Sequence, residues 1–289
     1  MSDRSVVLTG AGGTLGGAFA AALQGPGLIC LSRAALTSAD LTDLLSRLAP
    51  ALVINCAADT DVEAAESAPE RSFAVNSELP RALAQAAARC NAAMVHFSST
   101  GCYGDWKDTP YTENDPLRPT TVHHRSKAVG EEYVLRAHPG ALVLRLGWIF
   151  GGAPSARKNF VRARLREADG RDTLGCNPSQ RGNPTPAADV VAQVLSLVAA
   201  GIEGVVNCVG TGLPASRLEY VATILAAAGR NIRVVPVIYP RRAPVAANET
   251  AVNQRLDMLG FNQMRPWRQA LASYVSTLLT GPDEGPRTC

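Results

Sequence analysis

The chain has 289 residues and is 46% hydrophobic, which is enough for one large α/β domain with or without a smaller appendage. Its 28 Lys and Arg stand against 25 Asp and Glu, and no basic run gathers the small excess, which argues against a nucleic-acid partner. The chain has seven cysteines, none in a CxxC pair, and several lie in apolar runs, as Cys30 does. This pattern indicates small core residues in a reducing compartment and argues against a metal site. No apolar run has the length of a membrane span and no signal-like segment precedes the first predicted strand, so we expect a cytoplasmic protein without a membrane partner.

A glycine-rich turn follows the first predicted strand, an apolar run at residues 6–8. It leads into a predicted helix that ends near Leu23. Glycine has no Cβ and tolerates positive φ, so this turn can bend tightly and lie close to a pyrophosphate at the helix N-terminus. A structural turn without a nucleotide is the alternative. The cofactor contacts that we expect here are Gly10, Gly12, Gly13, Thr14, Leu15 and Gly16.

The second predicted strand, residues 27–31, ends at Ser32 and Arg33, where a dinucleotide site meets the adenosine ribose. An acidic residue there accepts a hydrogen bond from the 2′-hydroxyl of NAD, whereas a basic residue accommodates the 2′-phosphate of NADP. Because Arg33 is present and no acid is, the sequence favours NADP(H) and leaves NAD(H) open. Arg33 as an ordinary surface residue is the other interpretation.

Small and polar residues follow the next two predicted strands. A helix opens around residues 37–43, and the strand at 51–55 precedes small residues that let the backbone approach a flat cofactor. An alanine-rich helix over 69–90, interrupted near Pro80, leads to the strand at 93–97 and to hydroxyl side chains at 98–104. These hydroxyls mark either the reaction site at the carboxyl end of a strand or a run of turn-forming serines. The expected cofactor contacts after the third strand are Cys56, Ala57, Ala58 and Thr60.

The alternation of strands and helices continues through a polar loop at 105–121, a helix carrying residues 123–133 and a strand at 141–146. It predicts an α/β fold with a Rossmann-like, doubly wound parallel sheet. From residue 152 the pattern loosens into a smaller C-terminal lobe. There we expect helices over 160–168, 215–228 and 267–279, strands at 205–207 and 232–237, and a proline-rich turn at 183–186 before a helix led by Asp189.

These elements predict a division of the chain into parts. Residues 1–151 form a dinucleotide-binding domain, to which a segment around 186–210 returns. Residues 152–280 mainly form a substrate-binding lobe, and we expect residues 281–289 to be a disordered tail.

Several motifs occur in order along nearly the whole chain. They are Gly10-x-x-Gly13-x-x-Gly16, Asp40-Leu41, the block at 55–60, Pro110-Tyr111-Thr112-Glu113, Arg125-Ser126-Lys127, Arg145-x-x-Trp148-x-x-Gly151 and Gly182-x-Pro184-Thr185. In this series the chain resembles the extended short-chain dehydrogenase/reductase superfamily, and most closely its dTDP-4-dehydrorhamnose reductase group. The resemblance implies that Asp40 and Leu41 contact the adenine. The loop at 98–104 departs from that group and is more similar to the sugar-nucleotide epimerases.

The resemblance also implies a catalytic Ser or Thr, a Tyr and a Lys four residues after the Tyr, on one helix face. Ser99 stands at the serine position and Lys127 at the position of the lysine that binds the ribose and lowers the pKa of the tyrosine. His123 stands at the tyrosine position. Imidazole can supply a proton near neutral pH, although burial and Lys127 should lower the pKa of His123 and leave it mostly neutral. The alternative is that proton transfer is lost and His123 only lines a pocket.

Two neighbours of this set have weaker expected roles. We expect His124, one place off the helix face, to face solvent. Tyr103 is a candidate displaced acid, although the resemblance favours packing or substrate contact. The guanidinium groups of arginine side chains suit a pyrophosphate. The substrate contacts that the resemblance implies are Thr100, Tyr103, Arg145, Trp148, Asn159, Arg181 and Arg242.

Together these features predict an enzyme, an NAD(P)H-dependent reductase of a 4-keto-6-deoxy nucleotide sugar. One alternative is a non-catalytic NADP(H)-binding protein, either a sensor or a regulatory subunit. Another is a nucleotide-sugar epimerase or dehydratase, whose case the absence of the tyrosine also weakens. The expected partner is a nucleotide sugar or another small keto substrate, and the sequence is compatible with a homodimer.

Overall fold

The computed structural model describes residues 5–38, 40–154, 156 and 158–280. The tail at 281–289, for which we expect disorder, lies outside the described residues. Within the described ranges, no helix combines the length and apolar character that a membrane crossing requires. The same residues bring together no group of three or more His, Cys, Asp and Glu side chains that suits a metal ion.

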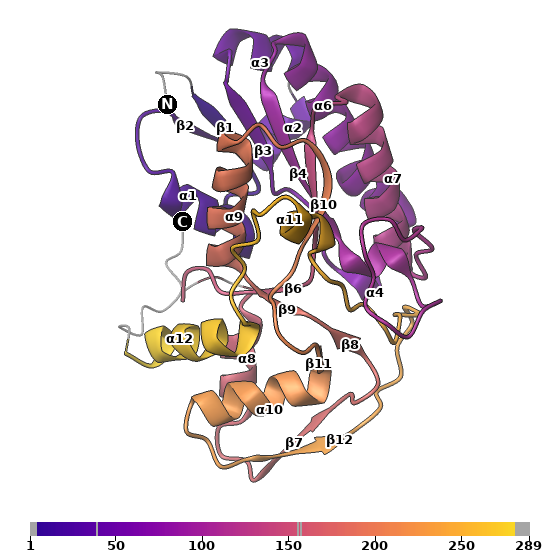
Figure 1. Cartoon of the computed structure of the whole chain (residues 1–289), viewed down its shortest axis with the longest axis vertical. Coiled ribbons are helices and arrows are strands. Elements are labelled where there is room, and N and C mark those ends of the chain that lie inside the picture. Colours follow the sequence, from indigo (N-terminus) through magenta and orange to yellow (C-terminus); the bar gives the residue numbers. More distant parts are fainter. Residues whose placement is uncertain (1–4, 39, 155, 157, 281–289) are drawn as a thin grey trace.

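A six-stranded parallel sheet forms the centre of the molecule (Figure 1). Its strands lie in the order β10-β5-β4-β3-β1-β2, and every pair of neighbours is parallel. This confirms the predicted Rossmann-like fold. The strands are β1 (Val6–Thr9), β2 (Leu28–Leu31), β3 (Leu52–Asn55), β4 (Ala93–Ser99), β5 (Leu142–Leu146) and β10 (Gly204–Cys208).

Helices cover both faces of the sheet because successive strand residues point to opposite sides. Leu8 packs with one group of helices, while its neighbour Val7 packs with the other group. The first group is α1 (Thr14–Ala22) and α9 (Ala187–Ala199), and the second is α3 (Leu41–Leu48), α6 (Leu79–Arg89) and α7 (Val122–Ala137).

Short helices connect the strands on the second face. The expected long helix at 69–90 is divided into α5 (Pro69–Phe73), a π-helical segment (Ala74–Glu78) and α6. Pro80 lies in the first turn of α6, where the missing N–H costs little, so the interruption falls just before it. The other connecting helices are α2 (Arg33–Ser38) and α4 (Val62–Ala65), and a 3₁₀ turn (Thr100–Tyr103) follows β4.

The C-terminal part builds a second core, centred on Tyr220 and Trp267. Figure 1 shows this part below the carboxyl ends of the sheet strands. The segment that contains β10 and α9 returns to the main sheet. The exact domain boundaries stay a prediction. The elements of this half are β6 (Trp148–Phe150), α8 (Phe160–Glu167), β7 (Thr173–Cys176), β8 (Arg181–Gly182), β9 (Pro184–Pro186), β11 (Ala215–Ser216), α10 (Arg217–Ala227), β12 (Arg233–Pro236), α11 (Gln254–Met258) and α12 (Trp267–Thr280).

Two local expectations are wrong. Residues 184–186 do not form a turn but strand β9, which pairs with β6 only, and a strand with one partner tolerates proline. Cys30 is exposed and not a core residue, because β2 is an edge strand whose alternate side chains are not covered.

Candidate active site

The glycine turn lies between β1 and α1 and is shaped by close backbone contacts. Gly10 has a φ of +69°, and a Cβ there would lie 2.6 Å from the carbonyl carbon of Cys56. A Cβ on Gly16 would lie 2.1 Å from the oxygen of Gly10, so only glycine lets α1 pack this closely. These two glycines are therefore required by the turn itself.

The outer side of the same turn is open. A Cβ on Gly12 would meet nothing within 4 Å, and Gly13 caps α1 without a side-chain hydrogen bond. Thr14 and Leu15, at the start of α1, are half-buried. A free backbone at a helix N-terminus is the feature that binds phosphate groups, so the turn fits a dinucleotide pyrophosphate.

The adenosine side of the site is formed by α2 and α3. Ser32 caps the start of α2 through its Oγ, which accepts from the Ala35 N–H at 3.2 Å, and Arg33 is exposed beside it. Asp40 caps α3, accepting from the N–H of Thr42 at 2.8 Å. A groove of about 460 Å³ runs past Asp40 and Leu41 to the π-helical segment, at the place expected for adenine.

A buried network holds the loop after β3. Thr9 donates to Asn55 Oδ1 at 2.6 Å, and both side-chain oxygens accept from the Ala57 N–H. Asn76 accepts from the Asp59 N–H and donates to Ser126 on α7. The small residues Cys56, Ala57 and Ala58 are therefore held in place while half-exposed, and Thr60 is exposed.

The three expected catalytic residues come from two packed elements, the end of β4 and the start of α7. The half-buried Ser99 ends β4, and its Oγ accepts from the Gly101 N–H at 3.2 Å. His123 and Lys127 lie one turn apart on α7 and are buried. Among the described residues no hydrogen bond joins these three side chains to one another.

Burial dominates the electrostatics of this set. It lowers the pKa of His123 to about 3, with further lowering by His124 and Lys127. The Nδ1 atom of His123 is buried and has no hydrogen-bond partner among the described residues. Burial also lowers the pKa of Lys127 to about 8, against the opposing influence of Cys102, Cys56 and Glu131. At neutral pH the site thus holds a neutral imidazole beside an ammonium group.

The expectation that His124 faces solvent is wrong. The 3₁₀ turn after β4 covers it, and a Cβ on Gly101 would lie 2.2 Å from its ring. His124 Nδ1 lies 3.1 Å from the Oγ1 of Thr121, the residue that caps α7. Burial, followed by the charge of Lys127, lowers the pKa of His124 to about 4.

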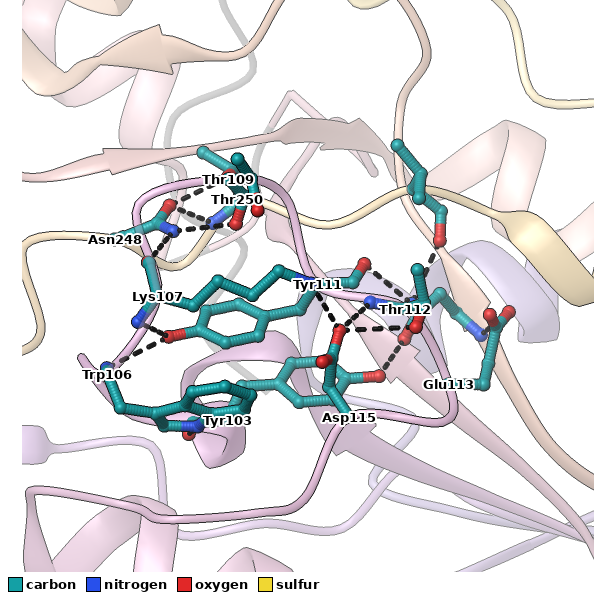
Figure 2. A network of polar contacts seen from close by, with 12 residues as sticks. Tyr103, Trp106, Lys107, Thr109, Tyr111, Thr112, Glu113, Asp115, Asn248 and Thr250 are labelled. Atoms are coloured by element: carbon teal, nitrogen blue, oxygen red, sulfur yellow. Dashed lines mark hydrogen bonds and ion pairs between the residues drawn. The ribbon is translucent and has the colours of Figure 1, made fainter.

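Tyr103 and Arg145 are both held within the scaffold, which favours the packing role expected for Tyr103 over its role toward substrate. Tyr103 is fully buried and stacks on Tyr111 with ring centroids 4.8 Å apart, as Figure 2 shows. Its hydroxyl donates to Asn207 Oδ1 at 2.7 Å and accepts from Arg145 Nη1 at 2.9 Å. Arg145 is in turn ion-paired with Glu131 in the core. Neither side chain is free to meet a ligand.

The loop around Tyr111 is held by a dense polar network (Figure 2). Lys107 Nζ and the Thr112 N–H both donate to Asp115 at 2.7 Å. Asn248 donates to the Lys107 carbonyl and thus joins this loop to the C-terminal half. The network thus holds the predicted polar loop at 105–121 in place, although several of its side chains are exposed.

The remaining expected substrate contacts are spread around the carboxyl ends of the strands. Thr100 is buried in the 3₁₀ turn, and Trp148 donates from Nε1 to Glu249 at 2.7 Å. Asn159 caps α8 and donates to the Tyr274 hydroxyl at 2.6 Å. Arg181 on β8 is exposed. Arg242 is also exposed, and its side chain donates to Ser67 in the other half.

Two residues near Trp148 were not expected from the sequence. Arg217 lies over its ring and Glu249 accepts from its indole. No motif contains either residue, and only the fold brings β6, α10 and the segment before α11 together.

The sheet, the glycine turn and the small-residue loop define a Rossmann-like protein with a dinucleotide-type site. The chain belongs to the RmlD substrate binding domain family, whose model matches residues 4–280. It is 34% identical to a dTDP-4-dehydrorhamnose reductase of Mycolicibacterium smegmatis, over 97% of this chain and 88% of that protein.

Solved structures agree with this assignment. A dTDP-4-dehydrorhamnose reductase from Clostridium acetobutylicum superposes with a TM-score of 0.89 at 25% identity, covering 95% of this chain and 99% of that one. A dTDP-4-dehydrorhamnose reductase from Bacillus anthracis, solved in complex with NADP, superposes with a TM-score of 0.87 at 24% identity. The superposition covers 94% of this chain and 98% of that one. The family places the chain among the oxidoreductases.

Proposed function

We propose that the protein reduces the keto group of a 4-keto-6-deoxy nucleotide sugar with NADPH. The observation that carries this proposal is the match over nearly the whole chain to proteins named dTDP-4-dehydrorhamnose reductase. The open glycine turn supports it, because a free helix N-terminus suits phosphate groups and the turn follows β1, the strand next to β3 and two places from β4 in the sheet. The substrate sugar and the stereochemistry at the reduced carbon are left open.

Arg33 supports NADPH over NADH. It begins α2 directly after β2, is exposed, and has no acidic neighbour in sequence before Asp40. A guanidinium at this place matches a 2′-phosphate, whereas NADH would gain nothing from it.

The chemistry requires a hydride on the carbonyl carbon and a proton on the carbonyl oxygen. Bound NADPH supplies the hydride. In our proposal the Ser99 hydroxyl orients the carbonyl oxygen, and His123 gives that oxygen a proton from one ring nitrogen. The other ring nitrogen takes a proton from the Lys127 ammonium, so the ring stays neutral and Lys127 ends as an amine. A relay suits an imidazole with a pKa of about 3, which does not hold an extra proton at neutral pH.

The test is the oxidation of NADPH by the purified protein with dTDP-4-keto-6-deoxy sugars. We expect turnover that Ser99→Ala lowers by about 10²-fold or more, because the substrate oxygen loses its donor. Normal turnover in Ser99→Ala would contradict the assigned site. Tightly retained oxidised cofactor with no net consumption would instead indicate an epimerase or dehydratase.

One observation favours a second candidate, an NADP(H)-binding protein without catalysis. By the resemblance, His123 stands at the position of the family tyrosine, and the hydroxyl of the nearby Tyr103 is engaged by Asn207 and Arg145, so neither of these two residues offers a free phenol. Saturable NADPH binding with no oxidation by any keto sugar would support that reading.

We also propose a cytoplasmic location and a homodimer. Analytical ultracentrifugation of the purified protein tests the dimer, and cell fractionation tests the location.

A further inference from the structure

The chain between β6 and α8 crosses the start of α1. It turns at Gly151 and Gly152, which have φ values of +106° and +77°. A Cβ on Gly152 would lie 3.0 Å from the Thr14 carbonyl oxygen, so glycine lets this segment pass close to α1. The C-terminal half thus reaches the helix N-terminus that fits a dinucleotide pyrophosphate.

Lys158, near the end of this segment, contacts two elements of the candidate cofactor site. Its carbonyl oxygen accepts from Thr14 Oγ1 at 3.0 Å, and its Nζ donates to Thr60 Oγ1 at 3.1 Å. Thr14 begins α1 directly after the glycine turn, and Thr60 lies in the loop after β3. These two loops follow neighbouring strands, β1 and β3, so Lys158 bridges them at the edge of the sheet where a dinucleotide binds.

No described carboxylate neutralises the charge of Lys158. Its side chain is exposed, and among the described residues it forms no ion pair. The hydrogen bond to the Thr60 hydroxyl uses one of the three N–H donors of the ammonium group. Lys107, by contrast, is paired with Asp115 at 2.7 Å. Within the described part of the chain, two donors and the full charge of Lys158 are therefore left for an anion.

The two segments that border the candidate site bring no positive side chain of their own. Residues 5–32, which contain β1, α1 and β2, include no Lys or Arg, and neither do residues 52–70, which contain β3 and α4. The second segment instead carries acidic residues, such as Asp59 and Asp61. A pyrophosphate on the glycine turn alone would meet backbone N–H donors and the helix dipole but no side-chain cation. Lys158 supplies the positive charge that both segments lack.

We propose that Lys158 binds the pyrophosphate of NADPH. Its Nζ exchanges the Thr60 hydroxyl for a phosphate oxygen, because a charged acceptor forms the stronger hydrogen bond with an ammonium group. Lys158 belongs to the C-terminal half, so the same contact ties that half to the bound cofactor. This inference rests on the proposed function in one respect, that the protein binds NADPH.

The test is calorimetric titration of the full chain with NADPH and, separately, with adenosine 2′-monophosphate, which carries the 2′-phosphate but no pyrophosphate. We expect Lys158→Met to bind NADPH about tenfold more weakly than the unsubstituted protein and to bind adenosine 2′-monophosphate equally well. Lys158→Arg should keep most of the NADPH affinity, because it keeps the charge. The matched control is Arg166→Met, which removes an exposed cation from the last turn of α8 and should bind both ligands normally.

Two results would overturn the inference alone. One is an NADPH affinity of Lys158→Met within twofold of that of the unsubstituted protein. The other is an equal loss of affinity for both ligands, which would mean that Lys158 only holds the two halves together. If the unsubstituted protein does not bind NADPH, the inference and the proposed function both fail. The proposed function fails separately if keto sugars are not reduced while NADPH affinity still depends on Lys158.

Discussion

Two buried cations lie on neighbouring elements and have opposite surroundings. Arg145 on β5 is ion-paired with Glu131, and it also donates to the Tyr103 hydroxyl and the Glu113 carbonyl. These partners raise the pKa of Arg145 above its usual value. Lys127 on α7 lies one turn before Glu131, but that carboxylate is turned to Arg145. Within the described residues Lys127 has no hydrogen bond or ion pair, and its pKa falls to about 8.

The difference separates a scaffold site from the site that we propose for the reaction. A buried charge is costly unless it is paired, and a paired one holds its elements together. The Arg145 cluster joins β5, α7 and the 3₁₀ turn after β4. Lys127 makes no comparable link among the described residues, which agrees with the proton-transfer role that we propose for it.

The largest effect should come from breaking the paired cation. Glu131→Gln leaves Arg145 buried without its counter-charge, and we expect the free energy of unfolding to fall by about 3–5 kcal/mol. Chemical denaturation measures it. The matched control is Glu132→Gln, which removes an exposed pair with Arg136 and should change stability by about 0.5 kcal/mol or less. Equal, small effects in both variants would contradict the comparison.

Replacing the unpaired cation, Lys127, should lower activity and leave stability intact. Lys127→Met is expected to lower the turnover of NADPH by about 10²–10⁴-fold, because the proton source is lost. It should be at least as stable as the unsubstituted protein at neutral pH, because a buried charge without a counter-charge is removed. Steady-state kinetics and thermal unfolding measure both. A variant that is inactive because it is unfolded would argue against a separate reaction site.

The pH dependence of stability checks the same residue. The pKa of Lys127 is about 8 in the folded chain and 10.5 when exposed, so the unfolded chain binds more protons between these values. The contribution of Lys127 to the free energy of unfolding therefore rises as pH increases from about 8 to 10.5. The Lys127→Met variant should not show that rise. Turnover should fall over the same range, as the ammonium group loses its proton.

The sequence predicted the sheet well because local patterns determine it. The glycine spacing, the buried runs such as residues 52–55 and the regular alternation of strands and helices each have a short-range physical cause. It failed where long-range packing decides. The exposure of Cys30 depends on β2 being an edge strand, and the pairing of residues 184–186 depends on β6.

The site shows the same division. Ser99, His123 and Lys127 were placed on the right elements from motif spacing, although their catalytic roles stay predictions. The partners of Tyr103 and the cover over His124 come from segments that the sequence does not connect, 104 residues apart in the bond from Tyr103 to Asn207. Arg217 carried no signal, because a single arginine at a helix start is ordinary.

Replacing His123 should change turnover by an intermediate amount. We expect His123→Phe to lower turnover by about 10–100-fold, since the relay is interrupted, while His123→Tyr should keep or raise it because a phenol is the family acid. The two aromatic variants control for ring packing. The reverse order of activities would count against the relay.

The smallest effect should come from a third cation, Arg33, which is exposed and lies at the adenosine end of the site. Its contribution needs neither burial nor a protein partner, because the 2′-phosphate of NADPH would be the partner. We expect Arg33→Ser to weaken NADPH binding by about tenfold, or about 1.4 kcal/mol, and to leave NADH binding unchanged. Titration of both cofactors measures the ratio, with Arg47→Ser, an exposed arginine paired with Asp43, as control. An equal change for both cofactors would mean that Arg33 supports the fold of α2 and does not read the phosphate, so cofactor preference would then have to come from another group near Asp40.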